Sequence, residues 1–132
     1  MDRLTGFFIV CLGGALGSGL RYLTALWAGA RGWTAFPWAT LIVNVVGCFL
    51  IMLIVTIASA TTMSPGMRLF LTTGMMGGLT TYSTFDLETT RFFQDGVPLT
   101  AFANIGATLV TCFVAGLLGL ALAKVLVPAA AS

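Results

Sequence analysis

Residues 74–85 are Gly-Met-Met-Gly-Gly-Leu-Thr-Thr-Tyr-Ser-Thr-Phe, and they interrupt an otherwise apolar segment that runs from about Arg68 to Phe93. Glycines followed by β-branched threonines form a poor helix centre, so we expect the helix of this segment to break near residues 77–81. A break frees backbone carbonyls, which a membrane tolerates only where they are buried or line a cavity. The alternative is close packing on a neighbouring helix, which explains Gly77 and Gly78 but not the hydroxyl run.

Three further apolar segments surround this one, from about Thr5 to Ala28, Trp38 to Ala60 and Leu99 to Val127. A helix needs roughly 20 residues to cross a bilayer. The sequence therefore predicts an all-α integral membrane protein with four transmembrane helices, the third broken near its middle, in a single domain of residues 1–132. The first segment resembles a signal peptide, but it is too long and too rich in glycine to be read as one.

The composition supports a membrane location. Hydrophobic residues make up 58% of the 132 residues, charged residues only 8%, and the mean hydropathy is +1.04. An average soluble domain has about 25% charged residues, so soluble and disordered classes are excluded. The net charge of +2 is too small for nucleic-acid binding. We expect a multi-pass membrane protein whose surroundings are the lipid bilayer.

The basic residues give no preferred orientation. With four spans, three lie on each side of the membrane: Arg3, Arg68 and Lys124 on one, and Arg21, Arg31 and Arg91 on the other. An excess of Lys and Arg on one side normally sets topology. Its absence favours dual topology, in which inverted copies pair as an antiparallel homodimer, whereas a weak bias set by another signal is the plainer alternative.

The residues for catalysis are missing. The sequence has no histidine, and its three cysteines lie in apolar stretches without CxxC spacing, so they predict structural thiols rather than a zinc site or a disulfide framework. Asp86 and Glu88 are two residues apart and face different directions on a helix. We therefore do not expect an enzyme.

Polar residues within the apolar segments fall into stripes at helical spacing. The stripes are Thr40 with Asn44, Thr81 with Thr84 and Glu88, and Asn104 with Thr108 and Cys112 beside Thr111. Such groups often only join helices. For Asn44 and the third segment, a transport path is the stronger interpretation, because buried polar groups in a membrane usually have a function.

The chemistry of these groups favours a small, hard anion. Amide and hydroxyl donors bind an anion without trapping it, and conduction requires weak binding. The rings of Tyr82 and Phe85, three residues apart, offer positively polarised edges. Arg21 lies near the end of its span, where it is expected to reach the interface, pair with a carboxylate such as Glu88, or assist an anion.

Four stretches resemble the Fluc (CrcB) family of bacterial fluoride channels, over essentially the whole chain. Residues 13–22 and 40–49 look like the motifs of its first two helices, and residues 77–85 with Glu88 are similar to its most specific motif, in the third helix. The fourth helix matches loosely. Tyr82 stands where the family usually has Phe, and Ala39 where it often has Gly.

The resemblance implies an antiparallel homodimer with two pores that passively exports fluoride and lowers its cytoplasmic concentration. It also implies a structural sodium ion at the dimer interface, held by the backbone carbonyls of Gly77 and Thr80, and no organic cofactor. We expect the following residues to line each pore: Asn44, Tyr82, Phe85, Thr40, Ser83, Thr84, Thr108 and Thr111. Arg21 and Glu88 are expected to be structural charges.

Two other functions compete with this one. A small dual-topology, proton-coupled multidrug exporter requires a membrane-embedded carboxylate, for which Glu88 is the candidate. A non-transporting membrane assembly would use the glycines and threonines for packing alone.

Overall fold

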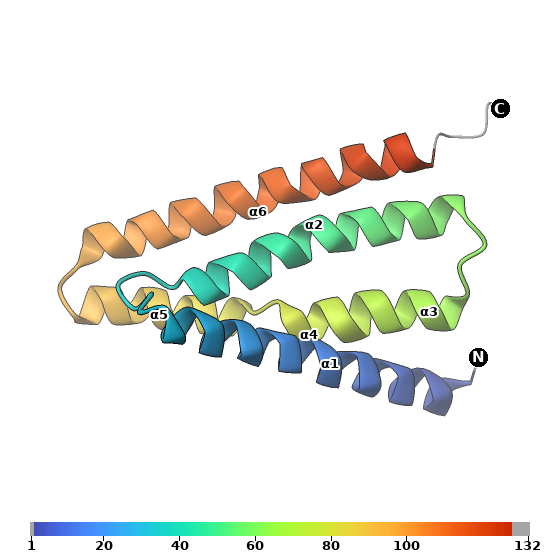
Figure 1. Ribbon diagram of the computed structural model, residues 1–132, viewed down its shortest axis with the longest axis horizontal. Coiled ribbons are helices and arrows are strands. Elements are labelled where there is room, and N and C mark those ends of the chain that lie inside the picture. Colours follow the sequence, from blue (N-terminus) through green and yellow to red (C-terminus); the bar gives the residue numbers. More distant parts are fainter. Residues whose placement is uncertain (1, 128–132) are drawn as a thin grey trace.

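The computed structural model describes residues 2–127, and every regular element within them is a helix (Figure 1). The long helices are α1 (Arg3–Ala30), α2 (Trp38–Ala60) and α6 (Pro98–Leu126). The third segment contains α3 (Pro65–Leu69), the π-helical turn η1 (Phe70–Met76), α4 (Gly77–Leu79) and α5 (Tyr82–Gln94). Ser64 caps α3, its side chain accepting a hydrogen bond from the Met67 amide.

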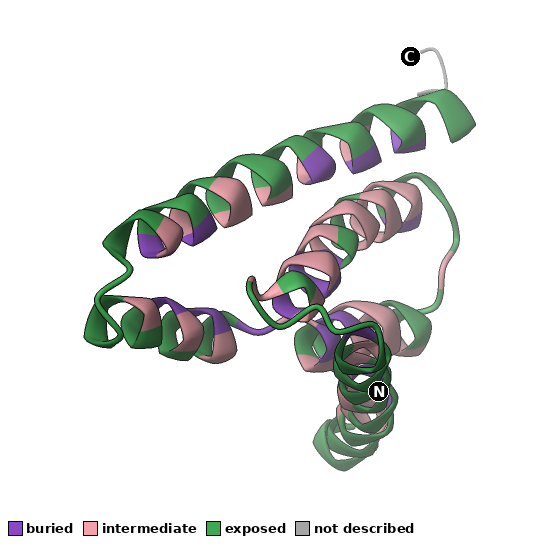
Figure 2. Cartoon of the chain, turned by 60° about the vertical axis from the view of Figure 1, so that its left-hand side comes forward, coloured by how far each residue is buried: buried purple, intermediate pink, exposed green. Residues whose placement is uncertain are grey.

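Three of these helices, α1, α2 and α6, are long and apolar enough to cross a membrane. Together with the composition, they make the chain a multi-pass membrane protein. The third segment is divided between shorter helices, so none of its pieces reaches that length. Residues that are buried lie on the faces that the helices turn toward one another (Figure 2). Most large apolar side chains instead point outward, as lipid or a second subunit would require.

The predicted interruption of the third segment is confirmed. The helix ends at Leu79, and Thr80 and Thr81 are extended, with ψ angles of 155° and 115°. The Thr81 hydroxyl then accepts a hydrogen bond from the Thr84 amide and caps α5. Ser, Thr and Asn side chains that satisfy backbone groups locally stabilise such helix starts. The two threonines therefore end one helix and begin the next.

The first half of the segment packs on α1 through glycines. A Cβ atom added to Gly13 would lie 2.9 Å from the Gly74 Cα, and one added to Gly78 would lie 3.0 Å from the Gly14 Cα. Gly77, by contrast, has open space where its Cβ would be. Close packing, the alternative offered by the sequence, thus accounts for Gly78 and not for Gly77.

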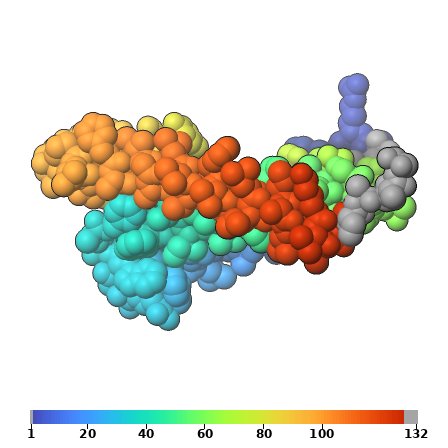
Figure 3. Space-filling view, turned by 90° about the horizontal axis from the view of Figure 1, so that it is seen from above, coloured from blue at the N-terminus to red at the C-terminus, as the bar shows by residue number. Residues whose placement is uncertain are grey.

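The second half of the segment, α5, packs mainly against α6. The Asn104 side chain of α6 is 1% exposed and donates a 2.8 Å hydrogen bond to the Thr89 hydroxyl of α5. Helix α6 also lies along α2, and α1 crosses beneath the pair at an angle (Figure 3). The third segment is therefore shared between α1 on one side of the break and α6 on the other.

An aromatic cluster closes one end of the bundle. The rings of Trp27 and Trp33 are 5.0 Å apart, those of Trp33 and Trp38 are 6.3 Å apart, and the Arg31 guanidinium lies 4.5 Å from the Trp27 ring centroid. The three tryptophans gather at one end of the bundle, an arrangement typical of an aromatic belt at a membrane boundary.

Candidate functional site

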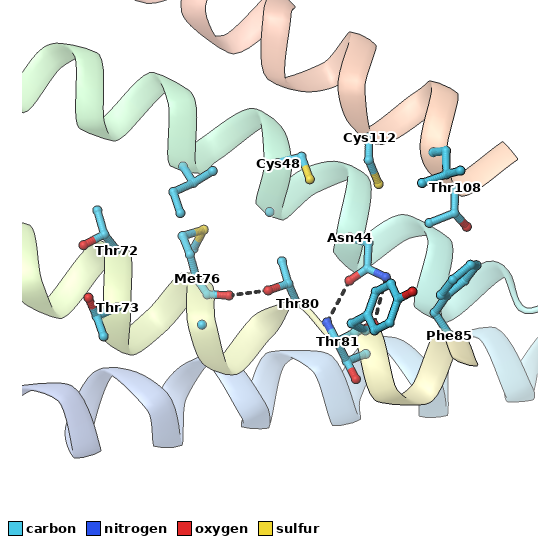
Figure 4. Close-up of a pocket in the computed structure, with 15 residues that line it drawn as sticks. Asn44, Cys48, Thr72, Thr73, Met76, Thr80, Thr81, Phe85, Thr108 and Cys112 are labelled. Carbon is cyan, nitrogen blue, oxygen red and sulfur yellow. Dashed lines mark hydrogen bonds between the residues drawn. The ribbon is translucent and has the colours of Figure 1, made fainter. Parts of the chain in front are cut away.

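A central cavity of about 630 Å³ opens beside the break, between α2, the third segment and α6 (Figure 4). Several of the residues predicted as pore or sodium site line it: Asn44, Gly77, Thr80, Tyr82, Phe85 and Thr108. They come from three separate stretches of sequence, so the fold brings the predicted groups to one place. The third-segment helix contributes residues from both sides of the break.

The side chain of Asn44 is hydrogen-bonded to the backbone at the break in the third segment. It is 8% exposed, its Nδ2 donates a 3.1 Å hydrogen bond to the Thr81 carbonyl, and its Oδ1 accepts a 2.8 Å hydrogen bond from the Thr81 amide. An asparagine amide carries two N–H donors. One is used by Thr81, and the structure gives the other no partner among residues 2–127. Asn44 thus binds the Thr81 backbone and keeps one N–H donor free for another partner.

The hydrogen bond from the Thr81 amide to Asn44 also leaves the Gly77 carbonyl without its helical donor. In a continuous helix the Thr81 amide would bond to the carbonyl of Gly77, four residues earlier. Here it bonds to Asn44 instead. Gly77 is exposed, lines the cavity and has no atom within 4 Å of its Cβ position. Its carbonyl therefore lacks its usual helical partner at an open position.

Two aromatic rings form part of the cavity wall. The ring centroids of Tyr82 and Phe85 are 5.5 Å apart, at an interplanar angle of 50°. Phe85 is 7% exposed and fixed by packing, whereas Tyr82 is 77% exposed. The Tyr82 hydroxyl makes no hydrogen bond within the described part of the chain. Phe85 therefore forms the buried part of this wall and Tyr82 the exposed part.

A second cavity, of about 340 Å³, lies on the other side of the break. Arg21, Thr40, Thr84 and Glu88 all line it. The Thr40 hydroxyl donates a 2.8 Å hydrogen bond to Glu88 Oε1, and Glu88 Oε2 is buried with no hydrogen-bond partner among the described residues. Arg21 shares this cavity but makes no ion pair with Glu88 in the described structure. The stripe of Thr81, Thr84 and Glu88 does face one cavity, as its spacing predicts.

Two predicted pore residues lie outside both cavities. Ser83 is exposed, with its hydroxyl 3.4 Å from that of Thr81. Thr111 is exposed on α6 and donates to the Ala107 carbonyl. The central cavity is lined instead by Thr72 and Thr73, which belong to none of the predicted polar stripes. Thr73 precedes Thr80 by seven residues, which is about two helical turns. This spacing predicts that the two threonines lie on the same face of the helix.

Comparison with known proteins gives relatives along most of the chain. A protein 45% identical over 92% of this chain and 96% of its own length is the fluoride-specific ion channel FluC of Sorangium cellulosum. The channel of the same name from Anaeromyxobacter sp. (strain K) is 49% identical over 81% of this chain and 86% of its own length. The one from Rhizobium meliloti is 45% identical over 90% of this chain and 96% of its own length.

A family model described as CrcB-like protein, Camphor Resistance (CrcB), matches residues 8–120. That span includes both cavities and the whole of the interrupted third segment. It confirms the resemblance seen in the sequence. With a match over most of its length and relatives at this level of identity, the chain belongs to the CrcB-like family.

Proposed function

We propose that this protein is a fluoride-specific ion channel that passively exports fluoride and lowers its concentration in the cytoplasm. The observation that carries the proposal is the buried Asn44, which presents an amide to the central cavity at the break. The name shared by the relatives supports the identity of the ion. The chain itself is a multi-pass protein of the bacterial membrane and is not an enzyme.

The donors around the central cavity suit a small anion. Replacing the water around fluoride requires N–H and O–H groups, and the cavity offers the Asn44 amide and the Thr108 hydroxyl. The edge of the Phe85 ring adds a partial positive charge. In this proposal Asn44, Tyr82 and Phe85 line the pore with Thr108, while Thr40 and Thr84 act from the second cavity.

The assembly in this proposal is an antiparallel homodimer with two pores. The two halves of the third segment together would make a fourth crossing, so that the chain is one four-helix channel domain. The even division of basic residues between the two sides allows insertion in either orientation. The outward-facing apolar side chains of one chain would be covered by lipid and by its inverted copy.

The backbone around Gly77 and Thr80 fits a structural sodium ion. Hard cations prefer oxygen ligands, and the Gly77 carbonyl has lost its helical partner at an open position. The carbonyls of Gly77 and Thr80 alone are too few for the oxygen shell of such an ion, so a second copy would complete it at the interface. A sodium ion there would supply fixed positive charge close to the anion path.

Fluoride efflux from liposomes tests the proposal. Purified protein in vesicles loaded with fluoride is expected to release it down its gradient, as followed with a fluoride electrode. Vesicles loaded with chloride instead are expected to retain their anion, since hard donors and a confined cavity favour the smaller ion. Equal release of both anions, or release of neither, would exclude a fluoride-specific channel.

Tyr82→Phe is expected to leave fluoride efflux within about twofold of the parent. The Tyr82 hydroxyl has no hydrogen-bond partner among the described residues, and the ring that faces Phe85 is retained. Tyr82→Ile, which removes the ring edge, is the matched comparison and should slow efflux by more than about tenfold. Equal rates for the two variants would show that the ring is not used.

A further inference from the structure

Two of the three cysteines meet where α2 and α6 pack together. Cys48 of α2 and Cys112 of α6 both line the central cavity, and both line a neighbouring cavity of about 420 Å³ between the same helices. Their thiols are neighbouring groups, and both side chains extend into the space between the two helices (Figure 4). The pair therefore stands between two cavities, one of them the proposed ion path.

Close helix packing holds the two thiols together. A Cβ atom added to Gly119 of α6 would lie 3.1 Å from the carbonyl carbon of Phe49, and one added to Gly116 would lie 3.7 Å from the Cys48 carbonyl oxygen. Cys112 precedes Gly116 by four residues, so both are on the same face of α6. The close approach of the two backbones thus places Cys112 opposite Cys48 across the contact between α2 and α6.

The surroundings of the pair favour a soft cation. The neighbouring cavity of about 420 Å³ is lined by apolar residues such as Ile51 and Phe113 around the two cysteines. The described residues contain no group of three or more side chains that would hold a metal in a larger shell. Hard cations need several oxygens, whereas thiolates select soft ions such as Cu(I). Soft ions with a filled d shell readily accept only two sulfur ligands.

We propose that Cys48 and Cys112 form a two-thiolate site for a soft cation with a filled d shell, and that its occupation obstructs the central cavity. With Hg²⁺ as the probe, each sulfur forms one bond to the metal and each thiol releases one proton, so the complex is neutral. Cu(I) or Ag(I) bound in the same way leaves one net negative charge, which would also repel an anion. The obstruction rests on the proposed function, whereas the binding site does not.

Metal retention tests the site without any transport. Purified protein, kept under reducing conditions and then freed of reductant without air, receives one equivalent of Hg²⁺ per chain and is washed with excess monothiol. A chelating pair should keep its metal against a competitor that removes it from single thiols. Native mass spectrometry should then find one mercury per chain in the parent and in Cys11→Ala, whose thiol is exposed on α1. Cys48→Ala and Cys112→Ala should retain none.

Several outcomes would overturn the site. Retention by Cys48→Ala or Cys112→Ala would show that the thiols do not act as a pair. Loss of mercury from Cys11→Ala would show that Cys11 binds the metal, so that Cys48 and Cys112 alone do not form the site. A mass lower by two hydrogens without bound metal would show that the thiols form a disulfide instead.

Transport then tests the obstruction. Mercury is expected to slow fluoride efflux by the parent and by Cys11→Ala at least about tenfold, with recovery on adding a dithiol. Cys112→Ala, compared with its own metal-free rate, should be insensitive. Efflux that continues while one mercury per chain is retained would overturn the obstruction. If efflux is absent even without metal, the proposed function fails, and the retention assay still decides the site.

Discussion

Asn44→Asp is expected to reduce fluoride efflux from liposomes to the level of protein-free vesicles. Aspartate can still accept the hydrogen bond from the Thr81 amide, but it has no N–H for the Thr81 carbonyl, which receives a 3.1 Å hydrogen bond from Asn44. Leaving a buried acceptor without its donor costs about 1–3 kcal/mol. The carboxylate also places a negative charge at the central cavity, where it repels the anion.

Asn104→Asp is the matched control, because Asn104 is also buried but bonds to Thr89 and does not line either cavity. It introduces the same charge in place of an amide, away from the proposed path. Any destabilisation should appear as a lower yield, while efflux per folded protein stays above that of Asn44→Asp. Parental efflux by Asn44→Asp would remove Asn44 from the pore.

Gly17→Ala is expected to prevent stable folding. The added methyl group would lie 2.8 Å from the Leu79 amide nitrogen and would collide with the Met75 carbonyl, and both are backbone atoms of the third segment. Inserting a methylene into a packed core already costs about 1–3 kcal/mol, and backbone yields less easily than side chains. Size-exclusion chromatography in detergent should show little or no monodisperse protein.

Gly19→Ala on the same helix provides the control. No atom lies within 4 Å of its Cβ position, and alanine is favoured over glycine in a helix by about 1 kcal/mol. This variant should elute like the parent and unfold at the same or a higher temperature. Comparable yields from Gly17→Ala and Gly19→Ala would contradict the close crossing of α1 over the third segment.

Much of the helix pattern could be predicted from the sequence because membrane helices are specified locally. The second apolar segment, Trp38–Ala60, has the same bounds in the structure, and Ser64-Pro65 starts α3 as its capping chemistry requires. The break at Thr80 and Thr81 was also predictable, since glycines followed by β-branched residues disfavour a helix wherever they occur.

Features that depend on contacts between segments were harder to predict. The hydroxyl of Thr111 has the same chemistry as that of Thr108, and only the rotation of α6 against α2 puts one inside the cavity and one outside. The π-helical turn at Phe70–Met76 left no local signal in the sequence. The roles of Gly77 and Gly78 differ only because Gly14 of α1 lies against one of them.

The division of the third segment between two packing partners has a mechanical consequence. Its first half is attached to α1 and its second half to α6, and the covalent link between them is a two-residue joint at Thr80 and Thr81. Any displacement of α1 relative to α6 therefore concentrates in the torsion angles of that joint. Asn44 of α2 is hydrogen-bonded to this joint through both polar groups of its amide. A single side chain thus resists the relative movement of two parts of the bundle, and the stiffness of the central cavity beside the break depends on it.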